Sequence, residues 1–262
     1  MQKLLYASFI CLFLSCSKSS NSPSPLLSAV ESREYAVQQI ISTQVDIQPA
    51  IMPEQLKIKT LLFEGIGLVR KYNYEYDSKG RITNITNVSN GNINSFFFEA
   101  KYNDEKKIVS ENGILFNTDV EGRIVSLTDE PNYKTFVYKN GYPLEKSGAY
   151  LNKFDSNGNI IRSERKDALG ALVFEYTNFP NNIRQEITST QAIQTSFRDI
   201  YAGKYSTNLI KKCTLDKLPN QSVRIEDELN FDYEFDAKNR VSKMTIKRLS
   251  DNKFFTYEYT YY

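Results

Sequence analysis

The chain has 262 residues, with 33 Lys and Arg against 31 Asp and Glu, and it contains no histidine. Balanced charge without a basic run longer than two residues argues against nucleic acid as a partner, because that requires a concentrated basic stripe. The absence of histidine excludes Ser-His and Cys-His nucleophile pairs and histidine zinc sites, so we predict no enzyme activity, no metal and no cofactor.

Residues 1–15 are predicted to be an export signal peptide. Lys3 supplies a short positive region, residues 4–14 form an apolar run of eleven, and Ser15 is a small residue before Cys16. A membrane-spanning helix needs about 20 apolar residues. The run is shorter than that, so the segment is not expected to remain as a spanning anchor.

Two cysteines in this region could be acylated, and what precedes each separates them. Ile10 precedes Cys11, whereas the small residue Ser15 precedes Cys16. The tetrad from Phe13 to Cys16 resembles the lipobox of bacterial lipoproteins, with Phe13 standing where Leu is usual. This resemblance implies lipidation of Cys16 by a diacylglycerol and an amide-linked acyl chain such as palmitate. More than one acyl chain gives stable attachment, so the expected membrane contact is the lipid anchor only.

Residues 16–28 comprise the lipidated cysteine and a flexible tether rich in Ser, Asn and Pro, a composition that cannot offset its ordering entropy. Residues 29–262 are expected to form a single repeat-built β-domain. Two stretches are less strand-like. Residues 36–41 have the pattern of a helix packed on the sheet, and residues 188–205 predict a loop or short helix.

A repeated motif runs through the domain. It reads aromatic, Asp or Asn, two variable residues, Gly or Asn, a polar residue, and then Ile or Val. Asp at the first turn position can accept hydrogen bonds from amides ahead of it, and Gly three residues later can adopt the positive φ that closes a hairpin. The motif therefore predicts a strand, a bulged turn and a second strand. Its fullest copies are centred on Asp77, Asp119, Asp155 and Asp236.

Flanking segments alternate in the manner of half-buried strands, with aromatic residues on one face and polar residues on the other. The strand ending at Tyr76 and the C-terminal strand are the clearest examples. We predict an all-β fold: a single large antiparallel sheet of about a dozen or more strands, built from these hairpins. Strong curling or closure as a barrel would shorten or remove its exposed edges.

From about Leu56 to Tyr262 the motif resembles the YD, or RHS-like, repeats of bacterial surface proteins. It is also similar to bacterial lipoproteins of unknown function whose hairpins form a porin-like antiparallel β-sheet. The resemblance implies a shell or stalk and no particular activity. Irregular spacing between the copies argues against a strict solenoid.

Each chemically suggestive group has a simpler structural interpretation beside it. The four motif aspartates could be calcium ligands, but each turn offers one Asp where a calcium loop needs several oxygens. Glu226, Asp227 and Glu228 could seed a carboxylate-based glycoside hydrolase, although such a cluster is more often a solvated face. Cys213, the one thiol left after processing, is expected to be buried and inert.

The aromatic stripes are a candidate ligand platform for a carbohydrate, although such a face is more often the core side of the sheet. The candidate platform residues are Tyr72, Tyr74, Tyr76, Tyr233, Tyr257 and Tyr259. A membrane-spanning pore is disfavoured because Lys, Glu and Asp occur throughout these strands.

Together these features predict a lipoprotein of a Gram-negative cell envelope, in the outer membrane and facing the periplasm or the cell surface. Its β-domain is expected to be non-catalytic, with a binding or structural role and a glycan or envelope protein as partner. A carbohydrate-binding module and a carboxylate-based glycoside hydrolase are the alternatives.

Overall fold

A computed structural model describes the chain over residues 42–47, 56–65, 67–89, 92–103, 108–111, 114–128, 136–146, 150–165, 171–183, 185, 204–216 and 228–262. The predicted signal peptide, Cys16, the tether, the candidate helix over residues 36–41 and residues 188–203 lie outside these ranges. Contacts divide the chain into Met1–Ala36 and Val37–Tyr262, and everything described below belongs to the second unit. None of its described helices has the length and apolar character needed to cross a membrane.

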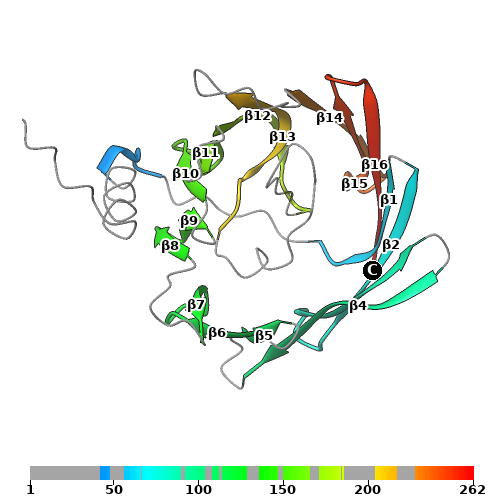
Figure 1. The fold of residues 1–262 in the computed structure, drawn as a ribbon, viewed down its shortest axis with the longest axis horizontal. Helices are drawn as coiled ribbons and strands as arrows, with labels where there is room; N and C mark the ends of the chain where they lie inside the picture. The colour runs from blue at the N-terminus through cyan, green and yellow to red at the C-terminus, as the bar shows by residue number, and fades with distance from the viewer. Residues whose placement is uncertain are drawn as a thin grey trace, which may run out of the picture. The chain divides into compact units, whose positions relative to one another are not determined.

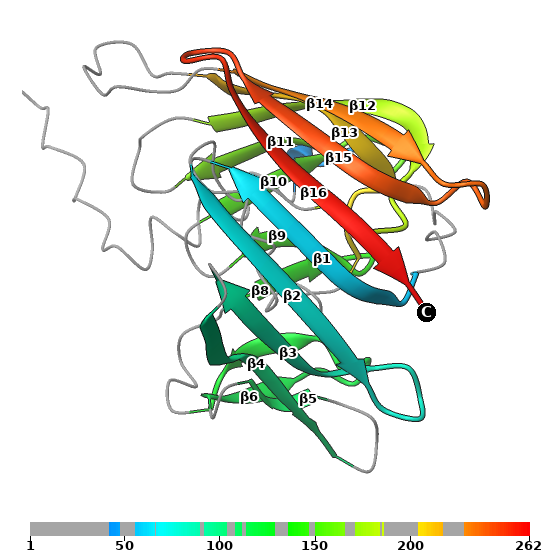
Figure 2. The same ribbon diagram turned by 90° about the vertical axis from the view of Figure 1, so that its right-hand side faces the viewer.

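The described residues form one 16-stranded sheet in which all neighbouring strands are antiparallel (Figures 1 and 2), as the hairpin motif predicts. The strands are β1 Ile58–Gly65, β2 Leu68–Tyr76, β3 Ile82–Ser89, β4 Asn92–Tyr102, β5 Ile108–Glu111, β6 Ile114–Thr118, β7 Ile124–Leu127, β8 Phe136–Lys139, β9 Tyr142–Lys146, β10 Tyr150–Phe154, β11 Ile160–Arg165, β12 Ala171–Pro180, β13 Asn208–Asp216, β14 Glu228–Phe235, β15 Val241–Arg248 and β16 Lys253–Tyr261.

The strand order runs β7-β6-β5-β4-β3-β2-β1-β16-β15-β14-β13-β12-β11-β10-β9-β8. β1 pairs with β16, so the first and last strands lie side by side in the middle of the sheet (Figure 2). The hydrogen-bonded order of the described strands is open and ends at β7 and β8, which corrects the expectation of a sheet that is strongly curled or closed as a barrel. Both end strands have four residues, and the described contacts between them include a hydrogen bond from the Tyr138 hydroxyl to the Ile124 carbonyl.

One face of the sheet is the core, as the alternation of aromatic and polar residues predicts. In β2, Tyr72 and Tyr74 are buried while Val69, Lys71 and Glu75 are exposed. β16 repeats this pattern with buried Phe255, Tyr257 and Tyr259. Side chains from strands throughout the sheet join one hydrophobic cluster. Burying each large ring contributes about 2 kcal/mol, so this face supplies much of the domain's stability.

The opposite face carries many polar side chains, although Val69 and Phe254 are also exposed on it. Thr60 and Thr260 face each other across β1 and β16, and their Oγ1 atoms are 2.7 Å apart. On β15, the Lys243 ammonium lies 3.7 Å from the Glu258 carboxylate and 3.9 Å from the Glu234 carboxylate. These contacts join β14, β15 and β16 across the face opposite the core.

Residues 42–47, here called the N-terminal segment, pack against the end of β10. The Gln44 side chain is 7 % exposed; its Nε2 donates to the Phe154 carbonyl at 2.9 Å, and its Oε1 accepts from the Phe154 amide at 3.1 Å. Ile47 packs into a small cluster with Tyr142, Leu144 and Phe154. The side-chain amide of Gln44 therefore satisfies backbone groups that β9, whose pairing reaches only the first residues of β10, leaves open.

Candidate functional site

The repeated turns have the geometry that the motif predicts. In the Asp77 turn, Gly80 has a φ of 78°, and its amide donates to the Asp77 carbonyl at 2.9 Å. The Asp77 carboxylate accepts from the amides of Lys79 and Arg81, both at 2.9 Å. The register shifts between Glu75 and Tyr76, which is the bulge expected beside such a turn. Hydrogen bonds to Asp77 therefore fix the backbone conformation of residues 77–81.

The turns at Asp119 and Asp236 repeat this arrangement, and Asn239 with a φ of 60° takes the glycine position in the second of these. At Asp155 the backbone pattern is the same, but Asn159 stands where the other copies have Arg. Its side chain reaches Asp155 and Asn208, both at 3.2 Å. The fourth turn is therefore joined to the start of β13.

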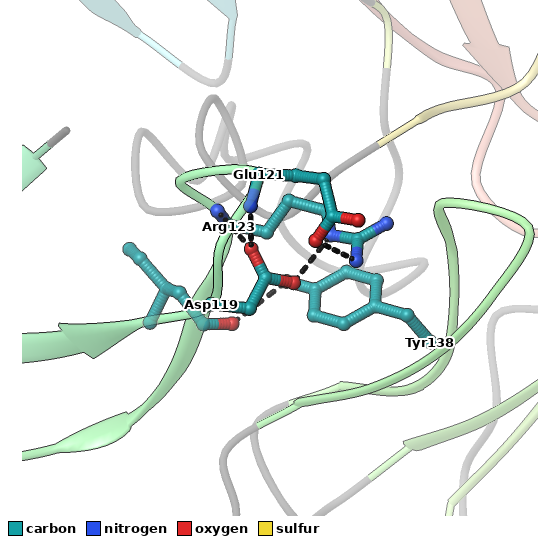
Figure 3. A network of polar contacts seen from close by, with 5 residues as sticks. Asp119, Glu121, Arg123 and Tyr138 are labelled. Atoms are coloured by element: carbon teal, nitrogen blue, oxygen red, sulfur yellow. Dashed lines mark hydrogen bonds and ion pairs between the residues drawn. The ribbon is translucent and has the colours of Figure 1, made fainter. Parts of the chain in front are cut away.

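An arginine that sequence reasoning did not single out completes three of the turns. The Nε atoms of Arg81, Arg123 and Arg240 donate to their turn aspartates at 2.6 to 2.7 Å. Each guanidinium also lies over the ring of a tyrosine from the next hairpin: 4.0 Å from the Tyr102 centroid, 4.8 Å from Tyr138 and 4.5 Å from Tyr261. Figure 3 shows the copy formed by Asp119, Arg123 and Tyr138, to which Glu121 adds an ion pair of 2.8 Å. We call this arrangement the Asp-Arg-Tyr contact.

The tyrosine hydroxyls finish the arrangement by donating to a backbone carbonyl at the start of another strand. Tyr102 donates to the Ile82 carbonyl at 2.6 Å, and Tyr261 donates to the Val241 carbonyl at 2.5 Å. Tyr138 to Ile124 and Tyr176 to Ile160 are similar, and in all four cases the acceptor is the first strand residue after a motif turn. Tyr76 to Ile58 and Tyr233 to Ile210 are hydrogen bonds of the same kind to carbonyls that do not follow such a turn.

The carboxylates of these turns are committed to structural contacts. Hydrogen bonds from Arg81 and Arg240 lower the pKa of Asp77 and of Asp236, so both are anions near neutral pH. Such a carboxylate has no proton to give as a general acid. Across the described ranges, no group of three His, Cys, Asp or Glu side chains is placed to hold a metal ion. The geometry favours the turn interpretation of these aspartates over calcium binding.

The six candidate platform tyrosines belong to the core face. Tyr72, Tyr74, Tyr257 and Tyr259 are buried, and Tyr76 and Tyr233 are partly buried against the same cluster. Burial raises the pKa of Tyr76 to about 12 and raises that of Tyr74 and Tyr259 further. The structure does bring the six together on one face, but that face is packed, and their burial favours the core interpretation over an open stacking surface.

The remaining candidates from the sequence are the acidic cluster at residues 226–228 and Cys213. Glu228 forms a 2.7 Å ion pair with Lys212 on the neighbouring strand, while Glu226 and Asp227 lie outside the described residues. Cys213 is fully buried, and burial raises the pKa of its thiol to about 12, in agreement with the prediction of an inert core cysteine.

No protein-family model and no curated protein matches this chain. Among solved structures, the chain is similar to a porin-like protein from Bacteroides uniformis ATCC 8492, with 13% identity and a TM-score of 0.46 over 78% of this chain and 98% of that one. It is also similar to a porin-like protein from Bacteroides vulgatus ATCC 8482, with 10% identity and a TM-score of 0.43 over 79% and 99% of the two chains. Neither likeness assigns a function to this chain.

Proposed function

We propose that this protein is a lipid-anchored protein of the cell envelope whose β-domain is a non-catalytic binding or structural scaffold. The observation that carries the scaffold role is the Asp-Arg-Tyr contact, because it uses the repeated acids to hold hairpins together. The anchor rests on the sequence before the domain, where a short apolar run leads to Ser15 and Cys16. We place the protein in the outer membrane of a Gram-negative cell, with a glycan or envelope protein as its partner.

Metabolic labelling with radioactive palmitate tests the anchor. We expect label in the wild-type protein and in the Cys11→Ser variant, and its loss in Cys16→Ser. The two variants make the same chemical change five residues apart, so they are matched. Label that disappears in Cys11→Ser, or that is absent from the wild-type protein, would contradict the assignment of Cys16.

Incubation of the purified protein with envelope glycans tests the non-catalytic role. We expect no release of saccharide. Metal-independent hydrolysis that one carboxylate substitution abolishes, for example Glu228→Gln, would overturn the scaffold and favour a glycoside hydrolase. Hydrolysis that persisted unchanged in every such variant would identify a contaminating enzyme and leave the scaffold standing.

A further inference from the structure

Two polar side chains, Arg70 of β2 and Asn87 of β3, lie on the aromatic core face of the sheet. Side chains alternate along a strand, so Arg70 is on the same face as buried Tyr72 and Tyr74. Asn87 is 8 % exposed and is paired directly opposite Tyr72. An arginine and an amide in this position are unusual, because such groups are seldom buried without partners.

The strand register brings these two side chains into one neighbourhood. Arg70 is paired with Ser89, two residues beyond Asn87, so the two lie on a diagonal that long side chains span. On the other side Arg70 is paired with Phe63 of β1. The Phe63 ring lies 5.0 Å from the Tyr257 ring. A cation, an amide and two rings thus occupy adjacent positions of four consecutive strands.

Both polar groups have an atom without a partner. The Nε of Arg70 and the Oδ1 of Asn87 are buried and make no hydrogen bond. Within the ranges that the structure describes, no ion pair includes Arg70. Asn152, by contrast, is satisfied, since it donates to the Pro143 carbonyl and accepts from Ser163. Arg81 Nη1, Asn84 Oδ1 and Asn182 Oδ1 are also buried without a partner, but the strand register places Arg70 and Asn87 side by side on the core face. Buried groups left open in this way are costly unless something else binds them.

The open atoms specify the chemistry of a ligand. Arg70 Nε requires an acceptor, and its charge favours an anion. Asn87 Oδ1 requires a donor, which sulfate does not provide. Phosphate keeps a proton near neutral pH and does provide one, but it has no apolar face for the adjacent Phe63 ring. A neutral sugar offers the donor without the charge, and a water molecule would leave the guanidinium without a counter-ion. The pair and the ring therefore fit one small molecule that carries a carboxylate, a hydroxyl and an apolar face.

We propose that Arg70 and Asn87 form a binding site for a sugar acid of the uronate type. The carboxylate accepts from Arg70, a ring hydroxyl donates to Asn87 Oδ1, and the apolar face of the sugar packs against the Phe63 ring, which is only partly buried. This site rests on the binding role proposed above and names its class of ligand.

Calorimetric titration of the acylated protein in detergent with sodium glucuronate tests the site, with glucose and sodium acetate as comparison ligands. We expect glucuronate to bind at least about tenfold more tightly than either, because each comparison ligand lacks one of the two interactions. Arg70→Met and Asn87→Leu should each weaken glucuronate binding about tenfold or more. Lys71→Met removes a cation from the exposed face of the same strand and should leave binding unchanged.

Near-UV circular dichroism reports whether each variant is folded. If Arg70→Met does not fold, Arg70→Lys keeps the charge but removes Nε, and a folded Arg70→Lys protein should still lose about tenfold in affinity. The site is wrong if glucuronate does not bind below about 10 mM, or if the folded Arg70 variant binds as the wild type does. That failure would leave palmitate labelling of Cys16 and the Asp-Arg-Tyr contacts intact, so it is distinguishable from failure of the scaffold proposal.

Discussion

The hydroxyl of Tyr138 donates a 2.8 Å hydrogen bond to the carbonyl oxygen of Ile124, and this bond joins β8 to β7, the two ends of the strand order. The five other tyrosine hydroxyls described above donate to a carbonyl of a strand that is already paired with their own through its backbone, as Tyr102 does to Ile82. In five places this hydrogen bond therefore adds to the backbone pairing between two neighbouring strands. Between β7 and β8 the described residues show the hydrogen bond but no backbone pairing.

Tyr138→Phe is expected to loosen the two end strands. Loss of one hydrogen bond costs about 1 kcal/mol of unfolding free energy, and hydrogen exchange should quicken at the amides of β7 and β8. Tyr102→Phe is the matched control, because it loses an equivalent bond within the β3–β4 ladder. It should show a similar loss of stability without faster exchange at its strands. Equal effects on exchange would contradict a special role for Tyr138.

The turn aspartates predict a loss of stability in acid. The pKa of Asp77 and of Asp236 is lowered in the folded protein, first by the hydrogen bond from the following Arg. Their contribution is present above the unfolded pKa of about 3.9 and is lost as pH falls through the lower folded pKa. The double variant Asp77→Asn, Asp236→Asn should therefore lower Tm near neutral pH and flatten the fall of Tm between about pH 5 and pH 2.

Asp232→Asn is the control for this titration, because Asp232 is an exposed acid on β14 outside any turn. It should leave the slope of Tm against pH close to that of the wild type. The interpretation fails if the double variant and the wild type lose Tm in parallel as the pH falls.

Local features of the fold were predictable from the sequence because they depend on residues a few positions apart. The spacing from Asp77 to Gly80 gives a turn, and the alternation from Tyr72 to Tyr76 gives a strand with one buried face. The same reasoning identified Cys213 as a core residue. None of these inferences required knowledge of which strand lies beside which.

Features that depend on pairing between distant segments were not predictable. The position of Arg81 over Tyr102 requires the register between two hairpins, and the contact of Gln44 with Phe154 joins residues 110 positions apart. Arg70 is different, since the sequence alone indicates on which face of the sheet its side chain lies. It lies two and four positions from Tyr72 and Tyr74, so strand alternation alone places a cation on the aromatic face.

Gln44→Ala should detach the N-terminal segment from β10. The substitution leaves the amide and carbonyl of Phe154 without their buried partners, so we expect a loss of about 1 to 3 kcal/mol in unfolding free energy. Limited proteolysis should then cut near residues 42–47 more rapidly. Val45→Ala changes a neighbouring side chain that is 50 % exposed and should have little effect. Equal stability of the two variants would show that Gln44 does not fasten the segment.

Alanine substitutions at Gly158 and at Gly67 can distinguish the cost of backbone strain from the cost of steric overlap. Both have positive φ, at 83° and 70°, so alanine at either position costs about 1 to 2 kcal/mol through the left-handed conformation alone. At Gly67 an added Cβ meets no atom within 4 Å, and that cost should be the whole effect. At Gly158 the Cβ would overlap the Tyr142 hydroxyl and lie 2.7 Å from its Cζ. Tyr142 is fully buried and cannot move aside.

We therefore expect Gly158→Ala to cost about 3 to 5 kcal/mol in chemical denaturation, against about 1 to 2 for Gly67→Ala. Adding Tyr142→Phe removes the hydroxyl and should restore part of the loss in Gly158→Ala but none in Gly67→Ala, because only the first pair is in contact. Additive losses in both double variants would mean that Tyr142 does not pack on the Asp155 turn in solution.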